Sequence, residues 1–183
     1  TPSADVEFIT IATLGNSIDF GDAQGGTSPG LWGDGACASS TRAVLGSWSN
    51  VSTNIDYIQM QTLGNSLDFG DMTSNTTYNC AAANSVRGLS AGDGVNSDAA
   101  IDAVTISTTG NAVDFGDMNT NKNARQACSS PLKMAIMGGG GPSYVSNCEY
   151  VNINTFGNGV EFGNASAAWG YSHDFSNSHG GLS

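Results

Sequence analysis

The feature that most constrains the fold of this chain is a nine-residue phrase that occurs four times, at residues 14–22, 63–71, 109–117 and 156–164. Each copy has Gly-Asn near its start and an acidic residue, Phe and Gly near its end. The acidic residues are Asp19, Asp68, Asp114 and Glu161, which are separated by 49, 46 and 47 residues. Such a period indicates that one supersecondary unit has been copied along the chain. We place the units at residues 5–52, 53–98, 99–146 and 147–183.

The residues around each Gly-Asn pair predict strands. In the first copy, Ile9 and Ile11 precede the pair, Ile18 and Phe20 follow it, and the residues between them are polar. Alternation with a period of two is typical of a strand with one buried face. Glycine at the first central position of a two-residue loop also suits a type II′ hairpin turn at Gly-Asn.

The rest of each unit predicts a second hairpin. A strand of small residues, a Ser/Asn turn and a short apolar strand follow the phrase, as at residues 38–44 and 83–89. Gly, Ser, Thr and Asn are too frequent for helices, and no segment shows a helical period. Each unit should therefore hold four short antiparallel strands.

Four short strands repeated in tandem are typical of a β-propeller blade. We therefore expect an all-β, propeller-like ring of four blades in a single domain, residues 1–183. Leu182-Ser183 matches Leu89-Ser90, and the chain begins with a segment that matches the one after Ser90. The two ends should then share the last sheet, with residues 1–22 pairing with residues 169–183, which would remove exposed edges. An open β-solenoid and a fragment of a larger ring are the competing architectures.

The order of elements in a unit resembles a kelch-type propeller repeat. A small-residue strand, a basic residue, a glycine-rich end (residues 138–141) and a variable loop lead to Asp56-Tyr-Ile or Glu149-Tyr-Val. The phrase Asp-Tyr-Ile-x-x-x-Thr-x-Gly-Asn-x-x-Asp-Phe-Gly-Asp is moreover similar to tandem repeats in virion structural and fibre-like proteins of tailed phages, particularly marine cyanophages. The resemblance implies a component of a particle surface or appendage, located on the virion or outside the cell, and implies no catalytic residues.

Charge and composition exclude several partners. The 16 acidic and 5 basic residues give a net charge of -11, which repels nucleic-acid phosphates and anionic lipid. No apolar run approaches the roughly 18 residues that span a bilayer. We expect no nucleic acid and no membrane insertion.

The four cysteines, Cys37, Cys80, Cys128 and Cys148, have no Cys-x-x-Cys spacing and no histidines at ligand spacing, so they do not match a zinc site. We expect buried free thiols, with disulfides as the alternative.

The acidic residues of the phrase allow three interpretations. Calcium could bind the carboxylates beside the Gly-Asn pair, at Asp19, Asp22, Asp68, Asp71, Asp114 and Asp117. The residue spacing of a calcium-binding loop is missing, however. Salt links between these acids and basic side chains would explain better why acids and bases occur together in the repeats. The bases Arg42, Arg87 and Lys133 occupy one repeat position, in the units that carry Asp22, Asp71 and Asp117. In the fourth unit the acid becomes Asn164 and the base becomes Gly180, so both disappear together. We expect salt links between these groups, with solvated charges as the third interpretation.

Loop aromatic residues are the candidates for partner or glycan contact. Trp32, Trp48 and Trp169 fall in or beside the variable loops, where such side chains stack on sugars, anchor a protein partner or cover the ends of sheets.

No unit brings together a nucleophile, a base and an oxyanion site. The two histidines, His173 and His179, lie in one low-complexity terminal unit, without a positioned nucleophile. We expect no enzyme and no cofactor apart from the calcium alternative. The expected function is that of a non-enzymatic virion structural, appendage or decoration protein that binds other virion proteins, copies of itself or a host-surface glycan. A secreted, lectin-like carbohydrate-binding propeller is the alternative.

Overall fold

The computed structural model describes residues 5–24, 35–46, 52–92, 99–140 and 143–171. Within these residues, every regular secondary-structure element is a β-strand. This part of the chain contains no helix long and apolar enough to cross a membrane. A hairpin of β1 (Asp5–Phe8) and β2 (Ile18–Asp22) forms a two-stranded sheet. Three four-stranded antiparallel sheets follow it along the chain. The all-β, four-stranded antiparallel arrangement predicted from the repeats is therefore confirmed for three sheets.

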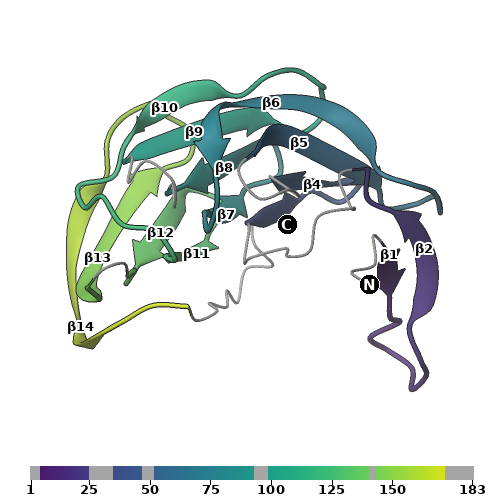
Figure 1. Cartoon of the computed structure of the whole chain (residues 1–183), viewed down its shortest axis with the longest axis horizontal. Helices are drawn as coiled ribbons and strands as arrows, with labels where there is room; N and C mark the ends of the chain where they lie inside the picture. The colour runs from purple at the N-terminus through teal and green to yellow at the C-terminus, as the bar shows by residue number, and fades with distance from the viewer. Residues whose placement is uncertain (1–4, 25–34, 47–51, 93–98, 141–142, 172–183) are drawn as a thin grey trace.

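Each four-stranded sheet takes its strands in chain order. The first contains β3 (Ala36–Ala38), β4 (Arg42–Gly46), β5 (Ser52–Gln59) and β6 (Leu67–Thr76). The second contains β7 (Cys80–Ala83), β8 (Arg87–Ala91), β9 (Ala100–Thr105) and β10 (Val113–Asp117). The third contains β11 (Gln126–Ser129), β12 (Lys133–Met137), β13 (Val145–Asn152) and β14 (Val160–Trp169). The sheets follow one another around a curved arc, with the β1–β2 hairpin at one end and β14 at the other (Figure 1).

The first strands of the three sheets come close together. β3 contacts β7, and β7 contacts β11. Their sequences are Ala-Cys-Ala, Cys-Ala-Ala-Ala and Gln-Ala-Cys-Ser, so small side chains let neighbouring sheets approach. A Cβ added at Gly35 would overlap the backbone nitrogen of Ala81. Two apolar clusters contain the main buried side chains, one including Leu89, Ile101, Phe115, Met134, Ile136, Val151 and Ile153, and the other Val44, Ile55, Phe69, Met72 and Ile106.

The phrase forms the last strand of each sheet and contains a β-bulge at its Phe. In the first four-stranded sheet, Asp68 pairs with Asp56 and Gly70 pairs with Ile55, so Phe69 has no partner in the strand register. The same shift occurs at Phe20, Phe115 and Phe162. A bulge bends its strand and turns the main-chain groups of the extra residue away from the ladder. Those groups can therefore bond outside their own sheet.

The reversal of the chain does not occur at Gly-Asn, contrary to the hairpin turn predicted there. In the first four-stranded sheet the turn comes earlier, where the amide of Thr62 donates to the carbonyl of Gln59 at 3.3 Å. Equivalent bonds close the other turns, from Thr13 to Thr10, Thr108 to Thr105 and Thr155 to Asn152. Gly64-Asn65 lies on the returning arm, which contacts the neighbouring unit.

The closed four-bladed ring stays a prediction. Residues 172–183, which would complete the fourth sheet, and residues 1–4 lie outside the described part of the chain. Trp169 pairs with Val145 in the third sheet rather than with residues 1–22.

Candidate functional site

The repeated phrase connects each sheet to the next through a fixed set of hydrogen bonds, which we call a junction. At the first junction, the carbonyl of Phe20 accepts from the amide of Gly64 at 2.8 Å, and the carbonyl of Asp22 accepts from the amide of Ser66 at 2.8 Å. The amide of Asp22 donates to Oδ1 of Asn65 at 3.1 Å. The end of one phrase thus binds the Gly-Asn start of the next.

The other two junctions repeat this pattern position by position. The second joins Phe69 and Asp71 to Gly110, Asn111 and Ala112, and the third joins Phe115 and Asp117 to Gly157, Asn158 and Gly159. Their hydrogen bonds are between 2.7 and 3.2 Å long. The phrase therefore encodes the contact between units as well as a strand.

The glycine after each bulged Phe makes this close approach possible. Gly70 and Gly116 have φ angles of 145° and 146°, which L side chains rarely adopt. A Cβ at Gly70 would lie 2.5 Å from the carbonyl oxygen of Gly110, and one at Gly116 would lie 2.5 Å from that of Gly157. Any side chain at these two positions would push neighbouring units apart.

A buried acidic residue supports each junction from the receiving sheet, in a role that the sequence reasoning did not assign. Asp102 accepts from the amide of Thr73 at 3.0 Å and from its hydroxyl at 2.6 Å. Glu149 accepts from the amide of Asn119 at 2.6 Å. Thr73 and Asn119 each follow the Asp of the preceding phrase by two residues. The signal was visible in the sequence, since Asp56, Asp102 and Glu149 align in the repeats.

Asp56 holds the first junction through a hydroxyl. Its carboxylate accepts from Oγ of Ser66 at 3.1 Å, and the same oxygen of Ser66 accepts from the amide of Gln24 at 2.8 Å. Burial raises the pKa of Asp56, and the nearby charge of Asp68 raises it further, whereas the hydrogen bond from Ser66 opposes the shift. The folded state therefore favours the protonated form of this carboxyl more than the unfolded chain does.

Glu149 also forms a buried ion pair that sequence reasoning missed. Its Oε1 pairs with Nη1 of Arg125, and neither side chain is exposed to solvent. Arg125 donates further to the carbonyl of Thr120 at 3.0 Å and to Oδ1 of Asn147 at 2.7 Å. Arg125 has no basic counterpart in the aligned units, where Asn79 occupies its position, so the repeat comparison could not identify it.

The aligned bases have partners that differ from the expected salt links. Arg42 donates from Nη1 to the carbonyl of Ile106 in the next sheet at 2.9 Å, and its guanidinium lies 4.3 Å from the ring centre of Tyr57. Arg87 donates to the carbonyl of Ile153 at 2.6 Å. These arginines do connect neighbouring sheets, but the acceptor is a main-chain carbonyl.

Lys133, the third aligned base, and the acids of the phrase also lack the predicted salt links within the described residues. Lys133 lies with Nζ 3.8 Å from the ring centre of Tyr150. In the described ranges the ion pair is the one between Arg125 and Glu149, and no aligned base pairs with Asp22, Asp71 or Asp117. The phrase acids contribute main-chain groups to the junctions, and the side chain of Asp71 instead accepts from the hydroxyl of Thr53 at 2.9 Å.

The structure does not gather the calcium candidates into a site. The six residues are distributed over three phrases on successive sheets, at Asp19, Asp22, Asp68, Asp71, Asp114 and Asp117. Within the described residues no group of three or more His, Cys, Asp or Glu side chains lies close enough to hold a metal ion. Asp114 accepts from the amide of Gly116 at 3.0 Å, which supports the bulge.

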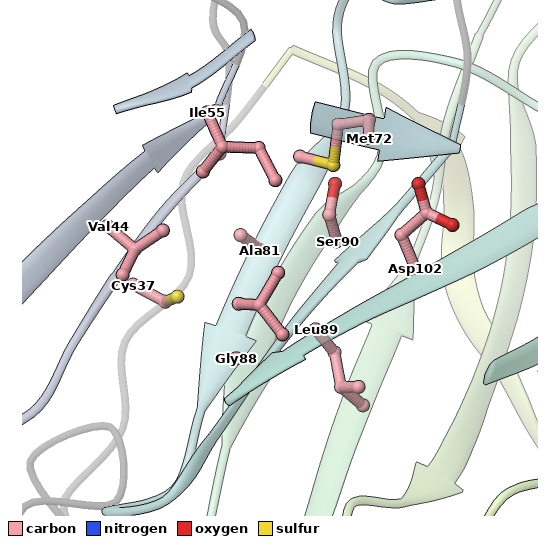
Figure 2. A pocket seen from close by; sticks show the side chains of 12 residues that line it. Cys37, Val44, Ile55, Met72, Ala81, Gly88, Leu89, Ser90 and Asp102 are labelled. Carbon is pink, nitrogen blue, oxygen red and sulfur yellow. The ribbon is translucent and has the colours of Figure 1, made fainter. Parts of the chain in front are cut away.

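A small, partly open cavity lies between the first two four-stranded sheets (Figure 2). It encloses about 20 Å³, which is room for about one water molecule. Cys37, Val44, Ile55 and Leu89 line it together with Asp102. A space of this size is a packing gap and holds no substrate.

The four cysteines are free thiols. The burial expected for them is found at Cys80, whereas Cys37, Cys128 and Cys148 are partly exposed. Cys37 lies on β3 beside the cavity, where a Cβ added at Gly88 would come within 2.5 Å of its sulfur. Burial raises the pKa of Cys37 to about 12, so the thiol stays protonated at neutral pH.

Two larger hollows are lined in part by the aligned arginines. One of about 340 Å³ is lined by Thr41, Arg42, Gln59, Gln61, Thr62 and Ser107. Another of about 150 Å³ includes Arg87, Thr105, Thr108, Asn111 and Phe156. Each is bordered by an aligned arginine and by polar side chains from more than one unit. Hydrogen-bonding side chains in both hollows could hold a small polar ligand.

The aromatic candidates are only partly placed. Trp169 is half-buried at the end of β14, where its carbonyl accepts from the amide of Gly139 at 2.9 Å. Its ring packs toward Gly138, since a Cβ there would lie 3.1 Å from Cε3 of Trp169. Trp32 and Trp48 lie outside the described residues.

Comparison with known proteins adds no relative. No protein-family model matches the chain. No curated protein matches it significantly in sequence.

Proposed function

We propose that this chain is a non-enzymatic structural module of a virus particle, a capsid decoration or tail-appendage component that binds other particle proteins or copies of itself. The similarity of its repeats to those of phage virion and fibre-like proteins motivates the particle setting. Contact with a host surface is part of this proposal.

One structural observation supports protein binding most directly. The apolar residue before the acid of the phrase is about half exposed in every copy, with exposed fractions between 48% and 52% at Ile18, Leu67, Val113 and Val160. The fold described above leaves this repeated set in water. An apolar side chain kept half exposed at the same position of every unit gives each sheet one contact point that another protein can cover.

Fractionation of particles tests this proposal. Antibodies against the chain should detect it in purified virions from a gradient, with a copy number that follows the symmetry of the capsid or of the tail. A matched protein of the host cytoplasm serves as the contamination control. Detection of the chain only in the free culture medium, never with particles, would refute the particle assignment.

A carbohydrate-binding function is the second candidate, and the larger of the two hollows favours it. Gln59, Gln61 and Thr62 line this hollow together with Ser107 and Arg42, and such side chains can form several hydrogen bonds with sugar hydroxyls. A glycan array should then give a signal that the Gln59→Ala, Gln61→Ala double variant loses. An array that stays blank at high protein concentration would refute the lectin function.

A further inference from the structure

The two ends of the arc present complementary halves of the same junction. The third sheet ends with the phrase Phe162-Gly163-Asn164 on β14, and the β1–β2 hairpin contains the Gly-Asn start at residues 15–17. Three internal junctions join such groups. The hairpin and β14 lie at opposite ends of the arc, so the two halves stay apart within one chain (Figure 1).

Within the described residues, the end of the third sheet is open where its equivalents are covered. Phe162 has an exposed fraction of 79%, whereas Phe69 and Phe115 are each 3% exposed. A Cβ at Gly163 would meet no described atom within 4 Å, although Gly163 has the same φ of 146° as Gly116. The bulged backbone is therefore already shaped for a neighbouring unit that the described part of the chain does not supply.

The β1–β2 hairpin is open in the complementary way. Leu14 and Ile11 are 105% and 95% exposed. At the formed junctions the residues aligned with Leu14 are less exposed, 66% at Leu63 and 58% at Phe156, and those aligned with Ile11 are 45% exposed at Met60 and buried at Ile106 and Ile153. Ser17 is exposed, but Ser66, its equivalent at the first junction, is fully buried. Glu7 is exposed as well, although its aligned counterparts Asp56, Asp102 and Glu149 are buried acids of junctions.

We propose that this chain associates head to tail, with β14 of one copy binding the β1–β2 hairpin of a second copy through a fourth junction. The carbonyl of Phe162 accepts from the amide of Gly15 of the second copy, and the carbonyl of Asn164 accepts from the amide of Ser17. The amide of Asn164 donates to Oδ1 of Asn16. Leu14 then covers Phe162, as Phe156 contacts Phe115 at the third junction, with 5.1 Å between ring centres.

The aligned base and acid extend the same contact. Lys133 occupies the position from which Arg42 and Arg87 reach the carbonyls of Ile106 and Ile153. Across the fourth junction the equivalent acceptor is the carbonyl of Ile11. Glu7 is placed to accept from the amide of Ser166, two residues beyond Asn164, as Asp102 accepts from Thr73.

A second copy is the occupant because each chain carries one half-junction of each kind. Such an interface joins two different surfaces, so it generates a closed ring or an open filament according to the rotation between copies. The fourth junction gives the proposed binding between copies of this chain a defined interface. The inference rests on the proposed function only for the biological setting of that binding. A monomeric chain would refute the interface, whereas the particle assignment is decided separately by fractionation.

Light scattering coupled to size-exclusion chromatography tests the inference on the full chain. The wild type should have a mass above that of one chain, and the mass should rise with concentration. Leu14→Asp and Phe162→Asp should each reduce it to the monomer, because each places a charge in the apolar contact. Val86→Asp, at an exposed apolar residue outside the half-junctions, should behave as the wild type.

Mixing the two end variants distinguishes head-to-tail contact from other modes. Leu14→Asp retains an intact β14 end, and Phe162→Asp retains an intact hairpin end, so an equimolar mixture should form one-to-one complexes. A wild type that stays monomeric at every concentration, as closure within one chain requires, would overturn the proposal. Variants that remain associated, or fail to combine when mixed, would also overturn it.

A backbone variant keeps the test decisive if either charged variant folds poorly. Ser17→Pro removes the amide that the fourth junction needs but lies on an exposed loop, so it should abolish association. Ser17→Ala retains the amide and reproduces the residue found at Ala112, so it should associate as the wild type does. Equal association of both variants would contradict the hydrogen-bond pattern.

Discussion

Alanine at Gly116 should break the third junction, whereas alanine at Gly163 should only strain the backbone. The two glycines share a φ of 146° and occupy the same position in the phrase. They differ in their surroundings, since a Cβ at Gly116 lies 2.5 Å from the carbonyl oxygen of Gly157 and a Cβ at Gly163 meets no described atom within 4 Å. Their comparison therefore isolates the energy of the junction from that of the backbone conformation.

The expected magnitudes follow from the interactions that each methyl group would disrupt. A non-glycine residue in this region of backbone space costs about 1–3 kcal/mol, and both variants carry this cost. Gly116→Ala also separates the groups that form three hydrogen bonds, worth about 1 kcal/mol each. It loosens the packing that buries Phe115 as well. Since three such bonds sum to about 3 kcal/mol, we expect Gly116→Ala to reduce the free energy of unfolding by about that much more than Gly163→Ala does.

Urea unfolding followed by far-ultraviolet circular dichroism measures this difference. Both substitutions should be made in the Phe162→Asp background, so that association through the fourth junction does not contribute. The midpoints are compared at equal slope, because a changed slope would report a change in the unfolded state or in cooperativity. Equal losses of stability in the two variants would show that the junctions add nothing to the fold.

Three further predictions concern side chains that are buried or partly buried. Glu149→Gln should lower the free energy of unfolding by about 3–5 kcal/mol, because it leaves the charge of Arg125 buried without its partner. Thermal or urea unfolding measures this loss, and the control Glu161→Gln, at an exposed site, should change stability little. Similar losses in the two variants would refute the ion pair. As the pH rises from 3.8, the usual pKa of an aspartate, through the raised pKa of Asp56, the wild type should lose stability relative to Asp56→Asn, because the native state binds the proton more tightly than the unfolded chain. Unfolding measured across that range with no relative change would contradict it. Cys37, whose pKa is about 12, should resist iodoacetamide at pH 8 until the protein unfolds, as peptide mass spectrometry would show; modification of the native protein at the unfolded rate would exclude its burial.

The strands were predictable because their signal lies in side chains. Alternation around the phrase identified the two strands of a hairpin, and the small residues at 83–89 identified the next one. The buried face predicted from that alternation was wrong at Ile9, which lies beyond β1 and is 63% exposed, and at Ile18, which is 52% exposed. The bulge at Phe20 breaks the period of two, so the residues on either side of it do not share one buried face. The hairpin turn was misplaced because Gly64-Asn65 has the composition of a turn but serves a contact between units. Glycine is required there by a neighbour that the sequence of one unit does not reveal.

The site was harder to predict because its bonds use the main chain. Disappearance of the acid and the base together in the fourth unit suggested a direct link, yet Arg42 binds the carbonyl of Ile106, and the acid of the phrase contributes its own backbone. Every residue type has a main-chain carbonyl, so the sequence does not indicate which carbonyl an arginine will bind. The buried acid at Asp102 was accessible to the alignment and was overlooked because it lies outside the phrase.

Because the main-chain bonds of every junction join two copies of one phrase and the supporting acid recurs in each repeat, a duplicated repeat carries the groups for both of its boundaries. An array built this way can gain or lose whole units without any compensating change elsewhere, since every new boundary reproduces the old one. Length can then vary between related chains while the local geometry stays constant. The bulged Phe with its following Gly is the element that makes such growth possible.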